Sequence, residues 1–217
     1  MSTDSVLIGG PQVSGGRVER RKARTNAALI AAARSLFAAQ GVEPTTIAEI
    51  AGRADVAVGS FYNYFATKDE LLKALLEAAL SEQLAALKSR QAQTSDAAEV
   101  ISVAHRHLIA LARTDPDMAW LLVRLEVPYR VTRSVLWESA SADLDAGVAA
   151  GLFDVADREL ALVASGGALL AVIHAVLHGE AAADVDSAHA EGVLRSFGLA
   201  PDRAAEIARR PLPPARA

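Results

Sequence analysis

Apolar residues recur every three or four positions through most of the 217-residue chain, which is the spacing of one face of an α-helix. No stretch alternates convincingly with the period of two that a half-buried strand needs. In the first part of the chain the pattern predicts four helices: residues 24–40, Thr46 to the turn GRADV, residues 58–65, and Thr67 to about Gln91. The second and third are short and joined by a tight turn, so they read as a helix-turn-helix.

Two of these helices carry explicit start signals. Thr46 precedes Glu49 by three residues, and Thr67 precedes Glu70 by three residues. In such a capping box the hydroxyl binds the third backbone N–H of the helix, and the carboxylate reaches back to the capping residue. Gly41 is a natural end for the first helix. The fourth helix is long enough to connect this head to a second domain.

The remaining chain is helical by pattern, with Pro and Gly at the breaks. We predict helices at residues 95–113, 116–126, 128–150, 155–178, 187–197 and 202–209. The expected fold class is therefore all-α, with an N-terminal three-helix helix-turn-helix domain and a C-terminal helical domain. The expected division is a disordered tail at residues 1–19, the head at 20–66 and the helical domain at 67–217.

Composition supports a packed helical protein and excludes several kinds of chemistry. Hydrophobic residues make up 52% of the chain, and alanine, the best helix former, is abundant. Without cysteine, the chain has no disulfides, thiolate metal sites or cysteine nucleophiles. The sequence has no paired-carboxylate metal motif, no GxSxG and no phosphate-cradling glycine loop. No enzyme constellation is recognisable, and no cofactor is expected.

Charge is unevenly distributed in a way that matters for nucleic acid. The net charge is −4, so contact with DNA requires a local basic patch. The segment RVERRKART supplies one, with a single Glu19 against Arg17, Arg20, Arg21, Lys22 and Arg24. Such a cluster is either the solvated start of a helix or an arm that reaches phosphates or the minor groove. Its place directly before a helix-turn-helix favours the arm, with Arg24 among its DNA contacts.

The third helix is unusual in its outer face. It offers water a hydroxyl, an amide and two phenols, from Ser60, Asn63, Tyr62 and Tyr64, where a soluble helix normally offers charges. These groups suit base edges and phosphates. The alternative is that the aromatic residues belong to the core, and for Phe65 we expect that. Tyr62 and Tyr64 point in different directions on a helix, so both cannot be equally buried in so small a domain.

The segment from Arg24 to Leu72 resembles the N-terminal domain of the tetracycline-repressor (TetR/AcrR) transcriptional regulators. The resemblance rests on the Phe-x-x-x-Gly end of the first helix, the Thr cap with Ile-Ala in the second, and the Tyr-x-x-Phe-x-x-Lys run. The remainder of the chain is similar to the family only in its helical pattern, its length and a PLPP tail. The resemblance implies a DNA-binding head and a C-terminal domain that holds a ligand and forms a dimer.

Carried over position by position, the resemblance implies DNA contacts. Thr46, Tyr62, Tyr64 and Lys68 would contact phosphates, whereas the bases would be approached by Ala48, Ala57, Val58, Gly59, Ser60 and Asn63. The sequence departs from the family at three positions. Asp55 replaces a usual glycine in the turn, Val58 replaces a commonly polar group, and Asn63 replaces a frequently larger side chain. Val58 would offer methyl contacts, for instance to thymine, instead of a bidentate hydrogen bond.

In the C-terminal half, small residues recur at helical spacing between 155 and 178. Ala164, Ala168, Ala171 and Ala175 let two helices approach closely, as in a four-helix bundle built from two subunits. The alternatives are an intramolecular core helix and, for the uncharged stretch 160–177, a membrane span. Ser165, the glycines and His174 argue against the span. We expect a homodimer.

Candidate ligand-pocket residues are the larger polar and aromatic side chains on these helices: His105, Trp120, Arg124, Tyr129, Trp137 and His174. A Trp beside an Arg or His would hold a flat apolar ligand with one polar handle. His174 and His178 share a helix face as metal ligands sometimes do, but Ala175 replaces the glutamate of the catalytic zinc pattern. No metal is assigned.

The sequence therefore predicts a cytoplasmic, ligand-responsive transcriptional regulator, most readily a repressor released from a palindromic operator. One alternative is an activator or architectural factor without a small-molecule ligand. A more remote one is a helical-bundle enzyme. The partners expected are double-stranded DNA, an unidentified small-molecule effector and a second copy of the chain.

Overall fold

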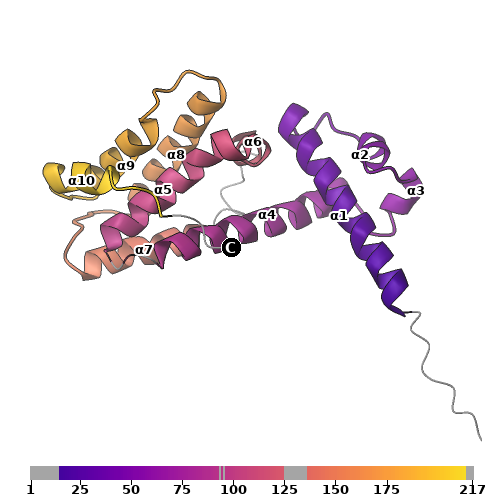
Figure 1. The fold of residues 1–217 in the computed structure, drawn as a ribbon, viewed down its shortest axis with the longest axis horizontal. Helices are drawn as coiled ribbons and strands as arrows, with labels where there is room; N and C mark the ends of the chain where they lie inside the picture. Colours follow the sequence, from indigo (N-terminus) through magenta and orange to yellow (C-terminus); the bar gives the residue numbers. More distant parts are fainter. Residues whose placement is uncertain (1–14, 93, 95, 125–135, 214–217) are drawn as a thin grey trace, which may run out of the picture.

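The computed structural model describes residues 15–92, 94, 96–124 and 136–213, and every regular element in these ranges is an α-helix. Two lobes are joined by one long helix (Figure 1). The head contains α1 (Gly15–Gln40), α2 (Ile47–Arg53) and α3 (Val58–Phe61), and α4 (Lys68–Gln91) leads away from it. The body contains α5 (Ala97–Thr114), α6 (Pro116–Arg124), α7 (Leu136–Ala149), α8 (Arg158–Leu177), α9 (Val185–Ser196) and α10 (Pro201–Ala208). The predicted fold class is confirmed.

The predicted helix starts and stops are largely confirmed. Thr46 is the N-cap of α2, and both bonds of its capping box with Glu49 are present. At α4 the Thr67 hydroxyl accepts from the Glu70 N–H at 3.1 Å, while the Glu70 carboxylate reaches one residue further back, to the Ala66 N–H at 2.7 Å. The helix ends at Gly41, Gly151, Gly179 and Gly198 all adopt positive φ, as C-terminal glycines do.

Two predicted boundaries were wrong. The first helix begins at Gly15 and not at Arg24, so residues 15–19 are helical and do not belong to a disordered tail. The reason is that residues 17–40 contain neither Gly nor Pro and are rich in Arg and Ala, which favour helix. The third helix ends at Phe61, because the chain turns after it and so brings Phe65 back into the core. The predicted helical segment 128–135 lies outside the described residues.

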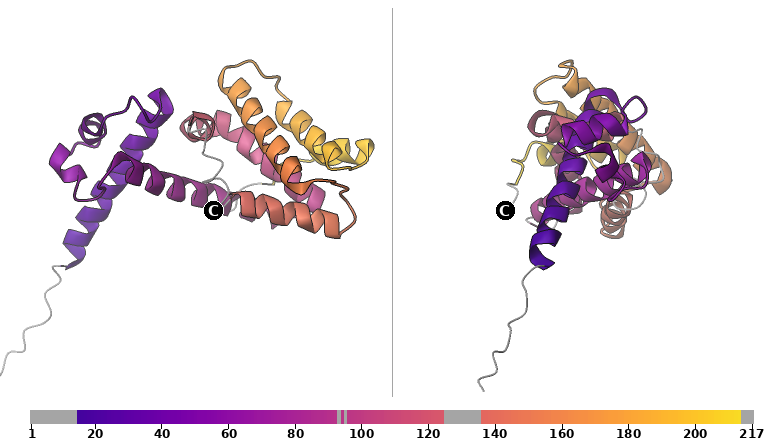
Figure 2. Two further views of the ribbon diagram at one scale, coloured as in Figure 1. Left: turned by 180° about the vertical axis from the view of Figure 1, so that it is seen from behind. Right: turned by 90° about the vertical axis from the view of Figure 1, so that its right-hand side faces the viewer.

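A hydrophobic core runs without interruption from the head into the body. In the head, Phe37, Phe61 and Leu71 are fully buried, and the same cluster continues through Met118 of α6 to Ile173 of α8. A second cluster holds α5, α7, α9 and α10 together around residues such as Phe153 and Phe197, whose rings lie edge to face at 5.6 Å. The left view in Figure 2 shows the head at one end of α4 and the body at the other.

A polar contact reinforces the junction between the two lobes. Arg34 of α1 forms an ion pair with Asp115, the residue between α5 and α6. The other carboxylate oxygen of Asp115 accepts from the Met118 N–H in the first turn of α6 at 3.2 Å. The orientation of α1 is therefore linked to the start of α6 by one carboxylate.

Gly147 provides a direct test of the second core. A Cβ at this position of α7 would overlap the Phe153 ring, whereas a Cβ at Gly192 of α9 meets nothing within 4 Å. We expect Gly147→Ala to lower the free energy of unfolding by about 1–3 kcal/mol through overpacking. The control Gly192→Ala should raise it by about 0.5–1 kcal/mol, because alanine is the better helix former. Urea unfolding followed by circular dichroism measures both, and equal effects would contradict the packing.

Candidate DNA-binding site and effector domain

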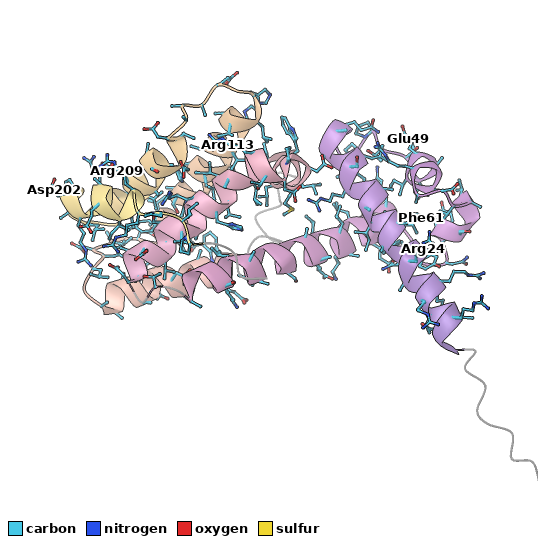
Figure 3. The ribbon with its side chains drawn as sticks, viewed as in Figure 1. Arg24, Glu49, Phe61, Arg113, Asp202 and Arg209 are labelled. Atoms are coloured by element: carbon cyan, nitrogen blue, oxygen red, sulfur yellow. The ribbon has the colours of Figure 1, made fainter. Side chains whose placement is uncertain are left out.

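The recognition surface depends on α3, a helix of only four residues. So short a helix has no independent stability, and burial must hold it. Phe61, labelled in Figure 3, is fully buried, and its ring centroid lies 5.9 Å from that of Phe65. With Phe61 facing inward, Ala57, Val58 and Gly59 face solvent, and Ser60 is half-buried. Ala48 and Asn63 are exposed as well. All the residues predicted to approach bases are therefore accessible.

The two tyrosines differ in exposure, as their spacing predicted. Tyr62 is 56% exposed and its ring packs edge-on against Phe61 at 5.4 Å, whereas Tyr64 is half-buried. Phe65 is buried, as expected. Asp55, in the turn before α3, has φ 55° and is the only residue other than glycine with positive φ in the described ranges. This side chain thus takes the left-handed conformation that the turn requires.

The capping box of α2 constrains what Thr46 can do. Its hydroxyl donates to Glu49 Oε2 at 2.8 Å and accepts from the Glu49 N–H at 3.2 Å. Hydrogen bonds from the Thr46 backbone and hydroxyl hold the pKa of Glu49 below its ordinary value, so this exposed carboxylate is charged. Thr46 is exposed, but a phosphate that binds its hydroxyl proton must compete with Glu49. The predicted phosphate contact stays a prediction.

Lys68 has main-chain partners within the protein that the sequence did not indicate, and its phosphate contact stays a prediction. Its ammonium, expected at a phosphate, donates to the main-chain carbonyls of Val42, Glu43 and Thr45 at 2.6, 3.2 and 2.9 Å. All three carbonyls belong to the connection between α1 and α2. In the structure this lysine therefore binds the protein's own backbone.

The basic segment forms part of α1 and not an extended arm. Figure 3 shows Arg24 on the end of α1 that projects beyond α2 and α3. Arg17, Arg20, Arg21 and Arg24 are all exposed and, at spacings of three, four and seven residues, lie on one helix face. A helix with side chains is about 10–12 Å wide and cannot enter a minor groove about 6 Å wide. The helical segment therefore favours phosphates over the minor groove.

Of the candidate pocket residues, Trp120 and His174 contact each other, and the other two with described side chains have different partners. Trp120 of α6 packs edge-on against His174 and His178, with ring centroids 6.1 and 5.3 Å apart. His105 of α5 contacts His189 of α9, and Trp137 of α7 packs on the second core cluster. Tyr129 and the Arg124 side chain lie outside the described part. His174 and His178 stack at 4.1 Å, but the described residues contain no group of three or more potential metal ligands.

Sequence reasoning missed the partner of His105, because His189 is far away in the chain and no motif joins them. His105 Nδ1 and His189 Nε2 are 3.0 Å apart between α5 and α9. Burial, with a smaller effect of His189, lowers the pKa of His105 to about 3, and burial also lowers the pKa of His189. Both rings are therefore neutral at neutral pH.

One face of α8 is apolar and uncovered. Leu160, Val163 and Leu170 are 63%, 38% and 36% exposed, and Ala164, Ala168 and Ala171 between them are exposed as well. Ala175 is half-buried. In the view from behind, α8 lies on the outside of the body (Figure 2). Among described helices it is the one long and apolar enough to cross a membrane by length and composition.

Taken together, an exposed helix-turn-helix on a helical body defines a DNA-binding regulator. Two family models match the chain: "Bacterial regulatory proteins, tetR family" over residues 29–75, and "Tetracyclin repressor-like, C-terminal domain" over residues 96–210. The second spans more than half of the chain. The protein therefore belongs to the tetracycline-repressor family of transcriptional regulators, whose members are soluble DNA-binding proteins.

Known relatives agree with this assignment. RolR, solved in complex with resorcinol, is 33% identical, with 91% of this chain and 100% of that chain covered and a TM-score of 0.72. The fatty acid degradation regulator FadR from Bacillus halodurans shares the fold at 20% identity and a TM-score of 0.67, over 80% of this chain and 99% of its own. The transcriptional regulator TcmR of Streptomyces glaucescens is 39% identical over 77 residues, which are 36% of this chain and 34% of TcmR.

Because of the histidine pair, we expect the stability of the protein to fall at acidic pH. Because the folded pKa of His105 lies below that of the unfolded chain, its contribution to stability is complete above about pH 6.5 and is lost as the pH falls toward 3. Over this range the free energy of unfolding should fall by about 1 kcal/mol for each pH unit that the pH is lowered. Urea unfolding at pH 7, 6, 5 and 4 measures it. The slope should be shallower in His105→Gln but not in His178→Gln, which changes an exposed histidine; identical slopes in all three proteins would contradict the assignment.

Proposed function

We propose that the protein is a homodimeric repressor that leaves a palindromic operator when a small molecule binds the body. The observation that carries this proposal is the uncovered apolar face of α8 on the same chain as an exposed recognition helix. A two-fold dimer through that face would present two copies of α3 to DNA. In helix-turn-helix dimers the recognition helices enter major grooves about 34–36 Å apart. Such a protein works in the cytoplasm, where the DNA is.

Contacts to DNA would be of two kinds. The arginine face of α1 and the exposed Tyr62 hydroxyl suit phosphates, which position a protein without reading sequence. Among the side chains expected at base edges, Ala57 and Val58 offer methyl groups, and only Ser60 and Asn63 can form hydrogen bonds. Methyl contacts with thymine therefore fit this surface better than a network of bidentate bonds.

The dimer is supported by the chemistry of the α8 face. Exposed leucine and valine beside small residues are typical of a surface that a second helix covers. A membrane would also cover an apolar face, but this helix packs its other face into the core through Leu162, Leu169 and Ile173. In a regulator of this family, a second copy of the chain would cover the exposed face of α8.

For the effector we propose a small hydroxylated aromatic molecule. RolR is 33% identical to this chain over the full length of RolR, and it was solved with resorcinol. In the body, the neutral His105–His189 pair keeps one ring N–H and one ring acceptor after its mutual bond, and Trp120 offers a separate aromatic surface beside His174 and His178. One donor with one acceptor matches what a hydroxyl needs. Ligand binding that displaces α6 or α4 would alter the separation of the two heads.

DNA binding is tested with a duplex that the wild-type protein selects from a random pool. The logarithm of the binding constant should fall linearly with the logarithm of the salt concentration. Arg20→Gln with Arg21→Gln should reduce that slope by about 2, since each lost phosphate contact removes about 0.9. Arg195→Gln, on the body, is the control and should leave the slope unchanged.

The possible outcomes test the parts of the proposal separately. Selection of no duplex contradicts DNA binding itself. A slope that the double variant leaves unaltered contradicts the role of α1. Adding resorcinol to the wild-type titration should weaken binding at least about tenfold, which is an allosteric coupling of about 1.4 kcal/mol. No change with resorcinol contradicts the effector class, and an increase in affinity would favour an activator.

The dimer interface is tested at Ala168. Ala168→Glu places a charge in the expected interface and should weaken the dimer by about 3 kcal/mol or more, because an unpaired buried charge is costly. Light scattering at micromolar concentration should then report a monomer for this variant and a dimer for the wild type. Ala188→Glu changes an equally exposed alanine on α9 and should remain dimeric. A dimeric Ala168→Glu variant would place the interface elsewhere.

A further inference from the structure

Lys68, the first residue of α4, binds the loop that leads into α2. The loop turns at Gly41, and its carbonyls at Val42, Glu43 and Thr45 converge on the lysine Nζ. An ammonium group carries three N–H donors and no acceptor. Three carbonyls within 3.2 Å therefore use every donor that Lys68 has.

The loop has no regular structure of its own, so these bonds determine its shape. Thr45 is almost fully buried; its N–H donates to the Val42 carbonyl at 3.2 Å and its hydroxyl to the Gly41 carbonyl at 2.6 Å. The Val42 carbonyl thus accepts from both Thr45 and Lys68 and is fully satisfied. Directly after Thr45 comes Thr46, the N-cap of α2. A shift of the loop consequently shifts the start of α2.

At the other side of this contact is the long helix. Lys68 stands in the first turn of α4, where the helix dipole disfavours a positive charge. The carbonyl dipoles of the loop offset that cost, because their negative ends face the ammonium. Because α4 runs from the head to the body (Figure 1), its first turn is joined to this loop by the Lys68 hydrogen bonds.

We propose that Lys68 is a positioning residue that makes the start of α2 follow α4, and that it contributes to operator affinity through this geometry and not through a phosphate. The proposal rests on DNA binding as proposed above. It assigns to one side chain the step by which a tilt of α4 reaches the DNA-reading pair of helices.

Salt dependence distinguishes the two roles. Lys68→Met keeps the apolar stem and removes the charge. On the selected duplex we expect about tenfold weaker binding, comparable to the loss of one hydrogen bond to a charged group, at every salt concentration and with an unchanged slope. Lost phosphate contact would instead reduce the slope by about 0.9 and make the defect vanish at high salt. Lys73→Met is the matched control, because Lys73 is exposed on the same helix and its ion pair with Glu77 is long, at 3.9 Å.

A second measurement needs no DNA. Hydrogen exchange of the full-length protein, followed by mass spectrometry, should show faster exchange over residues 41–50 in Lys68→Met than in the wild type or Lys73→Met. The proposal requires both results. A reduced salt slope overturns it, and so does exchange over 41–50 equal to that of the wild type. If no duplex is selected, the proposed function has failed, and the exchange measurement alone still decides whether Lys68 holds the loop.

Discussion

Burial of Phe61 is the interaction on which the recognition surface depends. A helix of four residues does not persist by its own hydrogen bonds, so the position of α3 is set by the one large side chain that it buries. Burying a phenylalanine completely contributes about 1.5–3 kcal/mol, and its ring lies in a core shared with Phe37 and Leu71. The exposed positions of Val58, Gly59 and Tyr62 follow from the direction in which Phe61 points.

The hydrophobic core around Phe61 also connects the DNA-binding head to the body. Because the cluster around Phe61 continues through α6 to α8, the head does not pack as an independent unit, and a displacement within the body would change contacts in the head. Lys68 and the Arg34–Asp115 pair add polar ties at two places along this junction. Linkage is reciprocal, so an effector that weakens DNA binding must itself bind less tightly to the DNA complex, by the same factor.

Much of the fold could be predicted from the sequence, because local signals determine it. The capping boxes, the glycines with positive φ and the apolar period located most helix ends correctly. The length of α1 was underestimated because the basic residues were interpreted by their charge and not by their helix propensity. Phe65 was assigned correctly to the core, whereas the length of α3 depends on a turn that tertiary packing imposes.

The chemistry of individual polar side chains could not be predicted in the same way. The resemblance predicts a phosphate contact for Lys68, and it could not predict the carbonyl partners, which only the folded loop brings together. His105 and His189 are paired by the packing of α5 on α9, and no local pattern encodes that contact. The exposed face of α8 was predicted as a run of small residues, since its period is local.

A dimer formed through α8 would present two α3 helices to neighbouring major grooves of the operator. Hydroxyl-radical footprinting on the selected duplex tests it most directly. We expect two protected patches related by two-fold symmetry, with centres about 10 base pairs, or one helical turn, apart. A single asymmetric patch, or two patches without that symmetry, would contradict it.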